Sequence, residues 1–162
     1  MIKSNEEVLA QAQRLHIEAE HLLYQGGLLA TIQRFGPAVV VGSVALRLMV
    51  RRDIDIYVQL ADDLDISTFF AIGAAITQEF PVFKASYSNH FIRNFSGFTH
   101  GLYWGIQLGY QEQGWKLDLW GHGVHHFAEH VATSQQLQSA LAAFDPLIVL
   151  RIKESLRAGD GY

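Results

Sequence analysis

The sequence contains no cysteine, only three prolines and few charged residues among its 162 positions. Without cysteine, the chain can form neither a disulfide nor a metal site held by thiolates. No apolar run approaches the roughly 18 residues that a membrane-spanning helix requires, and the first residues lack the apolar segment of a signal peptide. These absences predict a cytoplasmic protein without a membrane partner.

The chain does contain enough apolar residues to build a core. Hydrophobic residues make up 49% of the sequence and charged residues 17%, which is typical of a folded globular protein. The length favours a single domain over residues 1–162. The formal net charge of −4 disfavours a nucleic-acid partner, because non-specific binding to nucleic acid requires a basic face.

One short stretch near residue 50 organises the rest of the chain. An apolar run typical of a buried strand breaks at Gly42 and Ser43, and a short helix is predicted over residues 44–50. Polar and aliphatic residues then alternate strictly from Asp53 onward. Because successive side chains of a strand point to opposite faces, Asp53 and Asp55 share one face.

This arrangement of residues has a chemical interpretation. Two neighbouring carboxylates repel each other, so they require a cation between them or a proton on one of them. Carboxylate oxygens suit Mg²⁺, with Mn²⁺ as an alternative. Gly42 and Ser43 at the start of a helix offer backbone amides to an anion. The structural alternatives are a solvated strand face and an ordinary turn in which Ser43 is an N-cap.

Gly42-Ser43 followed by Asp53-Ile54-Asp55 resembles the signature of the nucleotidyltransferase superfamily, which includes DNA polymerase beta and the small minimal nucleotidyltransferases. The resemblance implies a Mg²⁺-dependent enzyme that moves a nucleoside monophosphate from a triphosphate, expected to be ATP, to an acceptor hydroxyl and releases pyrophosphate. It also implies two metal ions held by three carboxylates.

The third carboxylate is predicted to be Asp118. A hairpin is expected from strands over residues 102–110 and 115–120, and alternation places Lys116, Asp118 and Trp120 on one face. By the resemblance, Asp118 is a metal ligand and a candidate base, and the sequence does not separate the two roles. Trp120 shares the face of Asp118 and could stack on a base or an acceptor, or simply pack.

The phosphate-binding residues predicted from the resemblance are Gly42, Ser43 and Arg47. Gly42 and Ser43 would bind the β- and γ-phosphates. Arg47 lies one helical turn beyond Ser43 and could reach a phosphate, although a surface arginine explains it equally well.

The remaining segments predict an α/β (α+β) fold, a mixed sheet of about five strands with helices packed on one face. Helices are expected at about residues 4–35, beginning with a capping box of Ser4 and Glu7, and at about residues 134–158. A further helix is expected at residues 66–80. Residues 88–100 are predicted to form a loop over the open face of the sheet.

Four histidines, His122, His125, His126 and His130, follow the Asp118 strand. They raise the alternative of a zinc site, against a polar loop that leads into a helix beside the site. The acceptor is expected to be a small molecule or a protein. Two other functions stay open, a protein-modifying adenylyltransferase of the antitoxin kind and a non-catalytic module that binds a nucleotide or a partner. A homo-oligomer and a helical partner protein also stay open.

Overall fold

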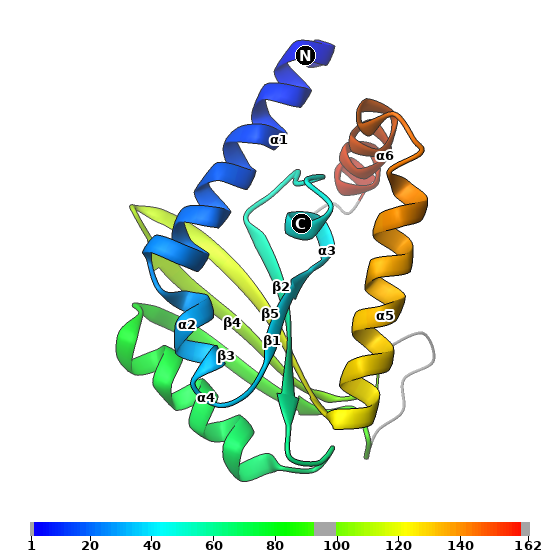
Figure 1. The fold of residues 1–162 in the computed structure, drawn as a ribbon. Helices are drawn as coiled ribbons and strands as arrows, with labels where there is room; N and C mark the ends of the chain where they lie inside the picture. Colours follow the sequence, from blue (N-terminus) through cyan, green and yellow to red (C-terminus); the bar gives the residue numbers. More distant parts are fainter. Residues whose placement is uncertain (1, 93–99, 160–162) are drawn as a thin grey trace.

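The computed structural model describes residues 2–92 and 100–159. Its five strands form one sheet in the order β1-β2-β5-β4-β3 (Figure 1). The strands are β1 (Ala38–Val41), β2 (Asp53–Leu60), β3 (Val82–Asn89), β4 (Leu102–Tyr110) and β5 (Gln113–Gly123). β2 and β5 are parallel and every other pair is antiparallel, so the sheet is mixed as predicted.

Helices α1 (Asn5–Glu20), α2 (Leu28–Gln33) and α4 (Ile66–Glu79) build the main core against one face of the sheet (Figure 1). The predicted capping box opens α1, where the Ser4 hydroxyl accepts a hydrogen bond from the Glu7 amide at 3.1 Å. A π-helical turn, His21–Gln25, links α1 to α2.

The aliphatic side chains of β2 point into this core. Ile54, Ile56 and Val58 are completely buried, whereas Asp55 and Tyr57 on the other face are only half-buried. Burying one such aliphatic side chain is worth about 1.5–3 kcal/mol, and a one-residue slip would turn all three to the opposite face. The core therefore fixes the register that places the carboxylates, and the predicted fold class is confirmed.

The short helix after β1, α3 (Gly42–Ala45), is one turn long, so the prediction of a helix over residues 44–50 is wrong beyond Ala45. Residues 46–50, which follow α3, contribute side chains to two separate hydrophobic cores. Met49 is buried in the main core, whereas Leu48 and Val50 are buried in a second, smaller core with Leu150. A continuous helix could not direct neighbouring side chains to both places.

Two carboxy-terminal helices complete the chain, α5 (Val124–Leu141) and α6 (Pro146–Gly159). α5 begins ten residues before the predicted position, so most of the histidine cluster lies on it. Its first turn is fixed by a residue distant in sequence, because the Asp63 carboxylate accepts a hydrogen bond from the Gly123 amide at 2.8 Å. α5 lies along the sheet face opposite the main core, so the helices are not confined to one face as the sequence predicted (Figure 1).

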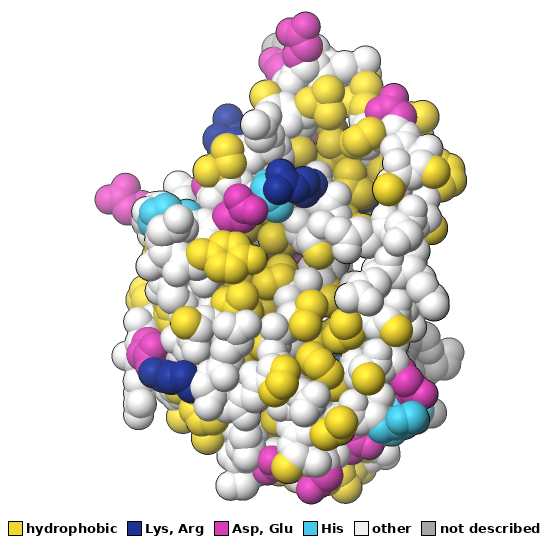
Figure 2. All heavy atoms as spheres, in the orientation of Figure 1, with side chains coloured by type: hydrophobic (Ala, Val, Ile, Leu, Met, Phe, Trp, Pro, Cys, Tyr) yellow, Lys and Arg dark blue, Asp and Glu magenta, His cyan; other side chains and the backbone are white. Residues whose placement is uncertain are grey.

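The surface carries few charges. On the face shown in Figure 2, Lys and Arg side chains are scattered among broad hydrophobic areas and form no basic patch. Within residues 2–92 and 100–159, no helix has the length and apolar character to cross a membrane. Of the loop predicted at residues 88–100, residues 93–99 lie outside the described residues, and β3 extends to Asn89.

Candidate active site

The structure brings the three predicted carboxylates together on the sheet face opposite the main core, the face along which α5 lies. Asp53 and Asp55 lie at the start of β2, and in the parallel pairing with β5 Asp55 stands beside Asp118. Asp53 is 9% exposed. The alternation seen in the sequence and the pairing of β2 with β5 therefore gather three acids into one small area.

Gly42 is packed directly against Asp55. It adopts a left-handed backbone conformation, φ +65°, and a Cβ atom at this position would lie 2.4 Å from Oδ2 of Asp55. A residue with a side chain would be strained in this conformation and would displace the carboxylate. The glycine of the predicted motif is thus required by the position of the acid.

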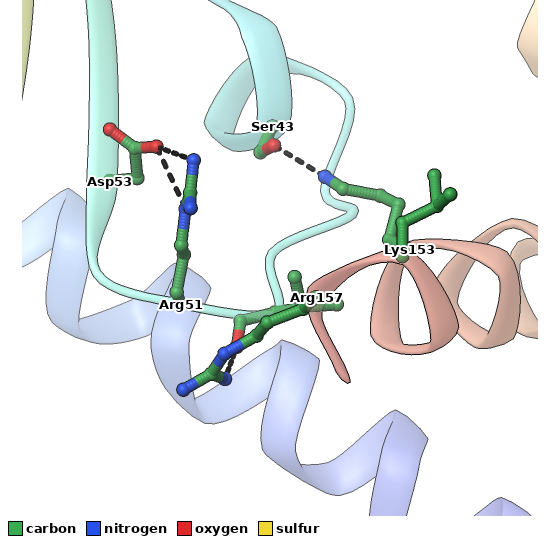
Figure 3. Close-up of a pocket in the computed structure, with 7 residues that line it drawn as sticks. Ser43, Arg51, Asp53, Lys153 and Arg157 are labelled. Atoms are coloured by element: carbon green, nitrogen blue, oxygen red, sulfur yellow. Dashed lines mark hydrogen bonds and ion pairs between the residues drawn. The ribbon is translucent and has the colours of Figure 1, made fainter. Parts of the chain in front are cut away.

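Ser43 faces a cavity of about 210 Å³ that is lined by Arg51, Asp53, Lys153 and Arg157 (Figure 3). Lys153 Nζ donates hydrogen bonds to Ser43 Oγ at 2.5 Å and to the carbonyl oxygen of Leu48 at 2.6 Å. The Arg157 guanidinium donates to the carbonyl oxygen of Val50 at 3.1 Å. Three cations beside a serine form a site suited to phosphate.

Sequence reasoning missed these three cations. Arg51 precedes the acid pair and lies in the turn before β2, where its guanidinium contacts Asp53 Oδ2 at 2.9 Å. Lys153 and Arg157 come from α6, and no pattern in the sequence connects that helix to Ser43. Their spacing of four residues indicates only a shared helix face.

Arg47 is not one of the cations that line the Ser43 cavity. It lies beyond the end of α3 with a left-handed backbone, φ +57°, rather than on a helical turn above Ser43. Its side chain is 73% exposed and its guanidinium lies 3.9 Å from Glu20 on α1. The residue therefore lies outside the cavity that Ser43 faces.

Burial and mutual repulsion disfavour the charged forms of Asp53 and Asp55. Burial raises the pKa of Asp55 to about 7, with further contributions from the charges of Asp53 and Asp118. Burial also raises the pKa of Asp53, while the charge of Lys116 opposes the shift. On the other side of the cavity, burial lowers the pKa of Lys153, and the charge of Asp55 opposes that shift.

The chemistry of Asp53 and Asp55 fits a hard divalent cation. Oδ1 of Asp53 is buried and has no hydrogen-bond partner among the described residues. Within the same residues Asp55 forms no direct hydrogen bond or ion pair, although the charges of Lys116 and Lys153 act on it. Buried carboxylate oxygens of this kind are the ligands that Mg²⁺ prefers. These two residues could hold the ion.

The arrangement of the histidines among the described residues gives no support to the zinc alternative. In the part of the chain that the structure describes, no group of three or more His, Asp or Glu side chains is arranged to hold a metal ion. His126 Nδ1 lies 2.7 Å from Asp63, and His125 pairs with Glu129 on the surface of α5. The ring of His122 is completely buried and lies 4.4 Å from that of His130.

A second cavity, of about 300 Å³, is lined by Asp55 and lies between the sheet and α5. Tyr57 and Trp120 supply aromatic rings from β2 and β5. His130, Thr133 and Ser134 supply polar groups from α5. Asp53 thus lines the cationic cavity and Asp55, two residues further along β2, lines the aromatic one.

Comparison with solved structures identifies the fold, although no protein-family profile and no curated protein matches the chain. The Cid1 poly(U) polymerase, solved with Mg and 3′-dATP, matches with a TM-score of 0.55 and 14% identity over 93% of this chain and 47% of the polymerase. A cytoplasmic RNA terminal U-transferase matches with a TM-score of 0.50 and 15% identity over 91% of this chain and 45% of the transferase.

Both proteins are members of the nucleotidyltransferase superfamily, so the chain has the nucleotidyltransferase fold that its motif predicted. The chain spans less than half the length of either protein.

Proposed function

We propose that this protein is a Mg²⁺-dependent nucleotidyltransferase that moves a nucleoside monophosphate from a nucleoside triphosphate to a hydroxyl group. One observation carries the proposal. Asp53, Asp55 and Asp118 converge beside a cationic cavity, and Oδ1 of Asp53 is buried without a hydrogen-bond partner among the described residues. Three acids in place also favour a catalyst over a non-catalytic binding module built on the same fold.

The two cavities, one lined by Asp53 and the other by Asp55, suggest how the triphosphate lies. The β- and γ-phosphates would occupy the cavity of Ser43, Arg51, Lys153 and Arg157, because its cations match their charge. The nucleoside would lie in the aromatic cavity, where planar side chains can stack on a base. This placement leaves the α-phosphate beside Asp55. ATP is the expected donor, and the 3′-dATP bound by the Cid1 polymerase is in keeping with it.

The chain's own residues then perform the transfer. The acceptor oxygen forms a bond to the α-phosphorus while the bond to the pyrophosphate oxygen breaks. Asp118 accepts the proton of the attacking hydroxyl, and Lys153 and Ser43 hold the leaving pyrophosphate in line. Asp53 and Asp55 would hold the divalent ion, which supplies Lewis-acid stabilisation of the phosphate oxygens when it is bound.

The acceptor is proposed to be a small molecule or a protein side chain. The names of both structural neighbours describe polymerases or transferases that act on RNA. This chain, however, has a net charge of −4, and the face in Figure 2 carries no concentration of basic side chains. Incubation with labelled ATP and separate pools of RNA, metabolites and protein would identify which class becomes labelled.

Calorimetric titration with MgATP tests the proposal. We expect the wild type to bind only when Mg²⁺ or Mn²⁺ is present, and the double variant Asp53→Asn/Asp55→Asn to lose binding. Glu112→Gln is a matched control, because it removes a carboxylate from the exposed β4–β5 turn. If the folded wild type bound no nucleoside triphosphate with either ion, the proposal would be refuted.

A further inference from the structure

Both oxygens of Asp118 already have partners. Oδ1 accepts a hydrogen bond from the Tyr103 hydroxyl, and Oδ2 lies 2.7 Å from Lys116 Nζ. The Asp118 side chain is 13% exposed and that of Lys116 is 45% exposed, so the carboxylate is largely buried while the lysine still meets water. A carboxylate placed in this way is neutralised by the protein itself.

The surrounding strands are built for these contacts. Lys116 and Asp118 lie two residues apart on β5, so both side chains point to the same face. Gly105 stands opposite Asp118 on β4, and a Cβ atom there would lie 2.7 Å from the Tyr103 hydroxyl oxygen. The glycine thus leaves the space through which Tyr103 reaches the carboxylate.

Lys116 also faces the first acid of the pair. In the parallel pairing of β2 with β5, Lys116 stands beside Asp53, just as Asp118 stands beside Asp55. The ammonium group therefore belongs to the same cluster as all three carboxylates. The positive charge of Lys116 therefore offsets negative charge on Asp53 of β2 as well as on Asp118 of β5.

The carboxylate oxygens without partners lie on β2. Arg51 contacts Oδ2 of Asp53, whereas Oδ1 is directed away from Arg51 and has no hydrogen-bond partner among the described residues (Figure 3). Asp55 forms no hydrogen bond or ion pair within those residues. The carboxylate oxygens without a hydrogen-bond or ion-pair partner therefore belong to Asp53 and Asp55, on one face of β2.

We propose that the Lys116 ammonium group takes the place of a second divalent ion beside Asp118, so that the site holds a single ion between Asp53 and Asp55. This inference rests on the proposed nucleotidyl transfer. It differs from the two-ion site implied by the sequence resemblance, because Asp118 orients and deprotonates the acceptor without ligating a metal. Each carboxylate oxygen has two lone pairs, so Asp118 can still accept the acceptor's hydrogen bond.

The number of bound ions tests this directly and does not depend on turnover. Mn²⁺ would be counted by equilibrium dialysis in the complex with α,β-methylene-ATP, and its electron paramagnetic resonance spectrum recorded. We expect one Mn²⁺ per chain, without the spin coupling that two ions about 4 Å apart would show. Two coupled ions in the wild type would overturn the inference.

Variants of Lys116 and Asp118 test which of the two residues controls the number of bound Mn²⁺ ions. Lys116→Met frees Asp118 and is expected to raise the count from one Mn²⁺ to two, whereas Lys84→Met, at an exposed position on β3, should leave it at one. A count that stays at one in Lys116→Met would contradict the role given to the lysine. Asp118→Asn should leave Mn²⁺ affinity unchanged, and a loss of affinity would show that Asp118 is a ligand.

The test separates this inference from the function on which it rests. If the protein bound neither Mn²⁺ nor the nucleotide, both the function and the inference would fail. If it bound the nucleotide with two Mn²⁺ ions, the function would stand and only the role of Lys116 would fail.

Discussion

Replacing Gly42 with alanine tests whether the packing of this glycine against Asp55 creates the site. The new Cβ atom would lie 2.4 Å from Asp55 Oδ2, which is closer than any real contact, so the carboxylate must move. The left-handed backbone at φ +65° adds a strain of about 1–2 kcal/mol for any residue that has a Cβ atom. Gly42→Ala should therefore lose both stability and binding.

The loss of stability and the loss of MgATP binding expected for Gly42→Ala have different causes and different sizes. The backbone strain should lower the melting temperature by roughly 2–8 °C in a domain of this size. Displacing Asp55 removes a contact to a charged group worth about 1.5–3 kcal/mol, which corresponds to roughly tenfold to hundredfold weaker MgATP binding. Thermal unfolding and calorimetric titration measure the two quantities independently.

Gly27→Ala is the matched control. Gly27 also has a left-handed backbone, φ +82°, but nothing lies within 4 Å of the position that its Cβ would take. It should therefore lose stability to a similar extent and keep full MgATP affinity. Wild-type affinity in Gly42→Ala would refute the argument that this glycine positions Asp55.

Three further predictions follow from the charges of the site and its surroundings. Because the pKa of Asp55 is about 7 in the folded protein and 3.8 ordinarily, the folded state binds more protons between these values, and stability without metal should fall as pH rises from about 4 to about 7. Asp55→Asn should flatten this dependence in urea unfolding with EDTA present, and an unchanged slope would contradict it. Burial lowers the pKa of His122 to about 3 from 6.5, so its contribution to stability is lost as pH falls below about 6.5. Guanidinium unfolding of His122→Phe should show weaker acid sensitivity than the wild type, while His125→Gln on the surface should not. Lys153→Met should weaken MgATP binding roughly tenfold to hundredfold, because it removes a cation from the Ser43 cavity, whereas Lys3→Met should bind normally.

The parts of the site that the sequence predicted are those set by short-range rules. Strand alternation alone places Asp53 and Asp55 on one face of their strand. The same rule places Asp118 on one face of the second hairpin strand, together with Lys116 and Trp120. The fold class follows from the same periodicities. Each of these inferences needs only residues within one strand or two neighbouring ones.

The parts that could not be predicted depend on contacts between distant segments. Lys153 reaches Ser43 only because α6 docks beside α3, across 110 residues of sequence. The early start of α5 depends on a hydrogen bond from the Gly123 amide to Asp63. Arg47 leaves the expected helical position because Leu48 and Met49 are buried in different cores. None of these contacts has a periodic signature in the sequence.

The supply of Lys153 and Arg157 by the last helix has a consequence during synthesis. Domains generally fold as units while the chain is being made, and a nascent chain could form the sheet and its acid cluster before α6 leaves the ribosome. Until that helix docks, the cavity beside Ser43 lacks two of its three cations. We therefore expect the growing chain to bind a triphosphate only after α6 has docked, so that nucleotide binding reports this docking step.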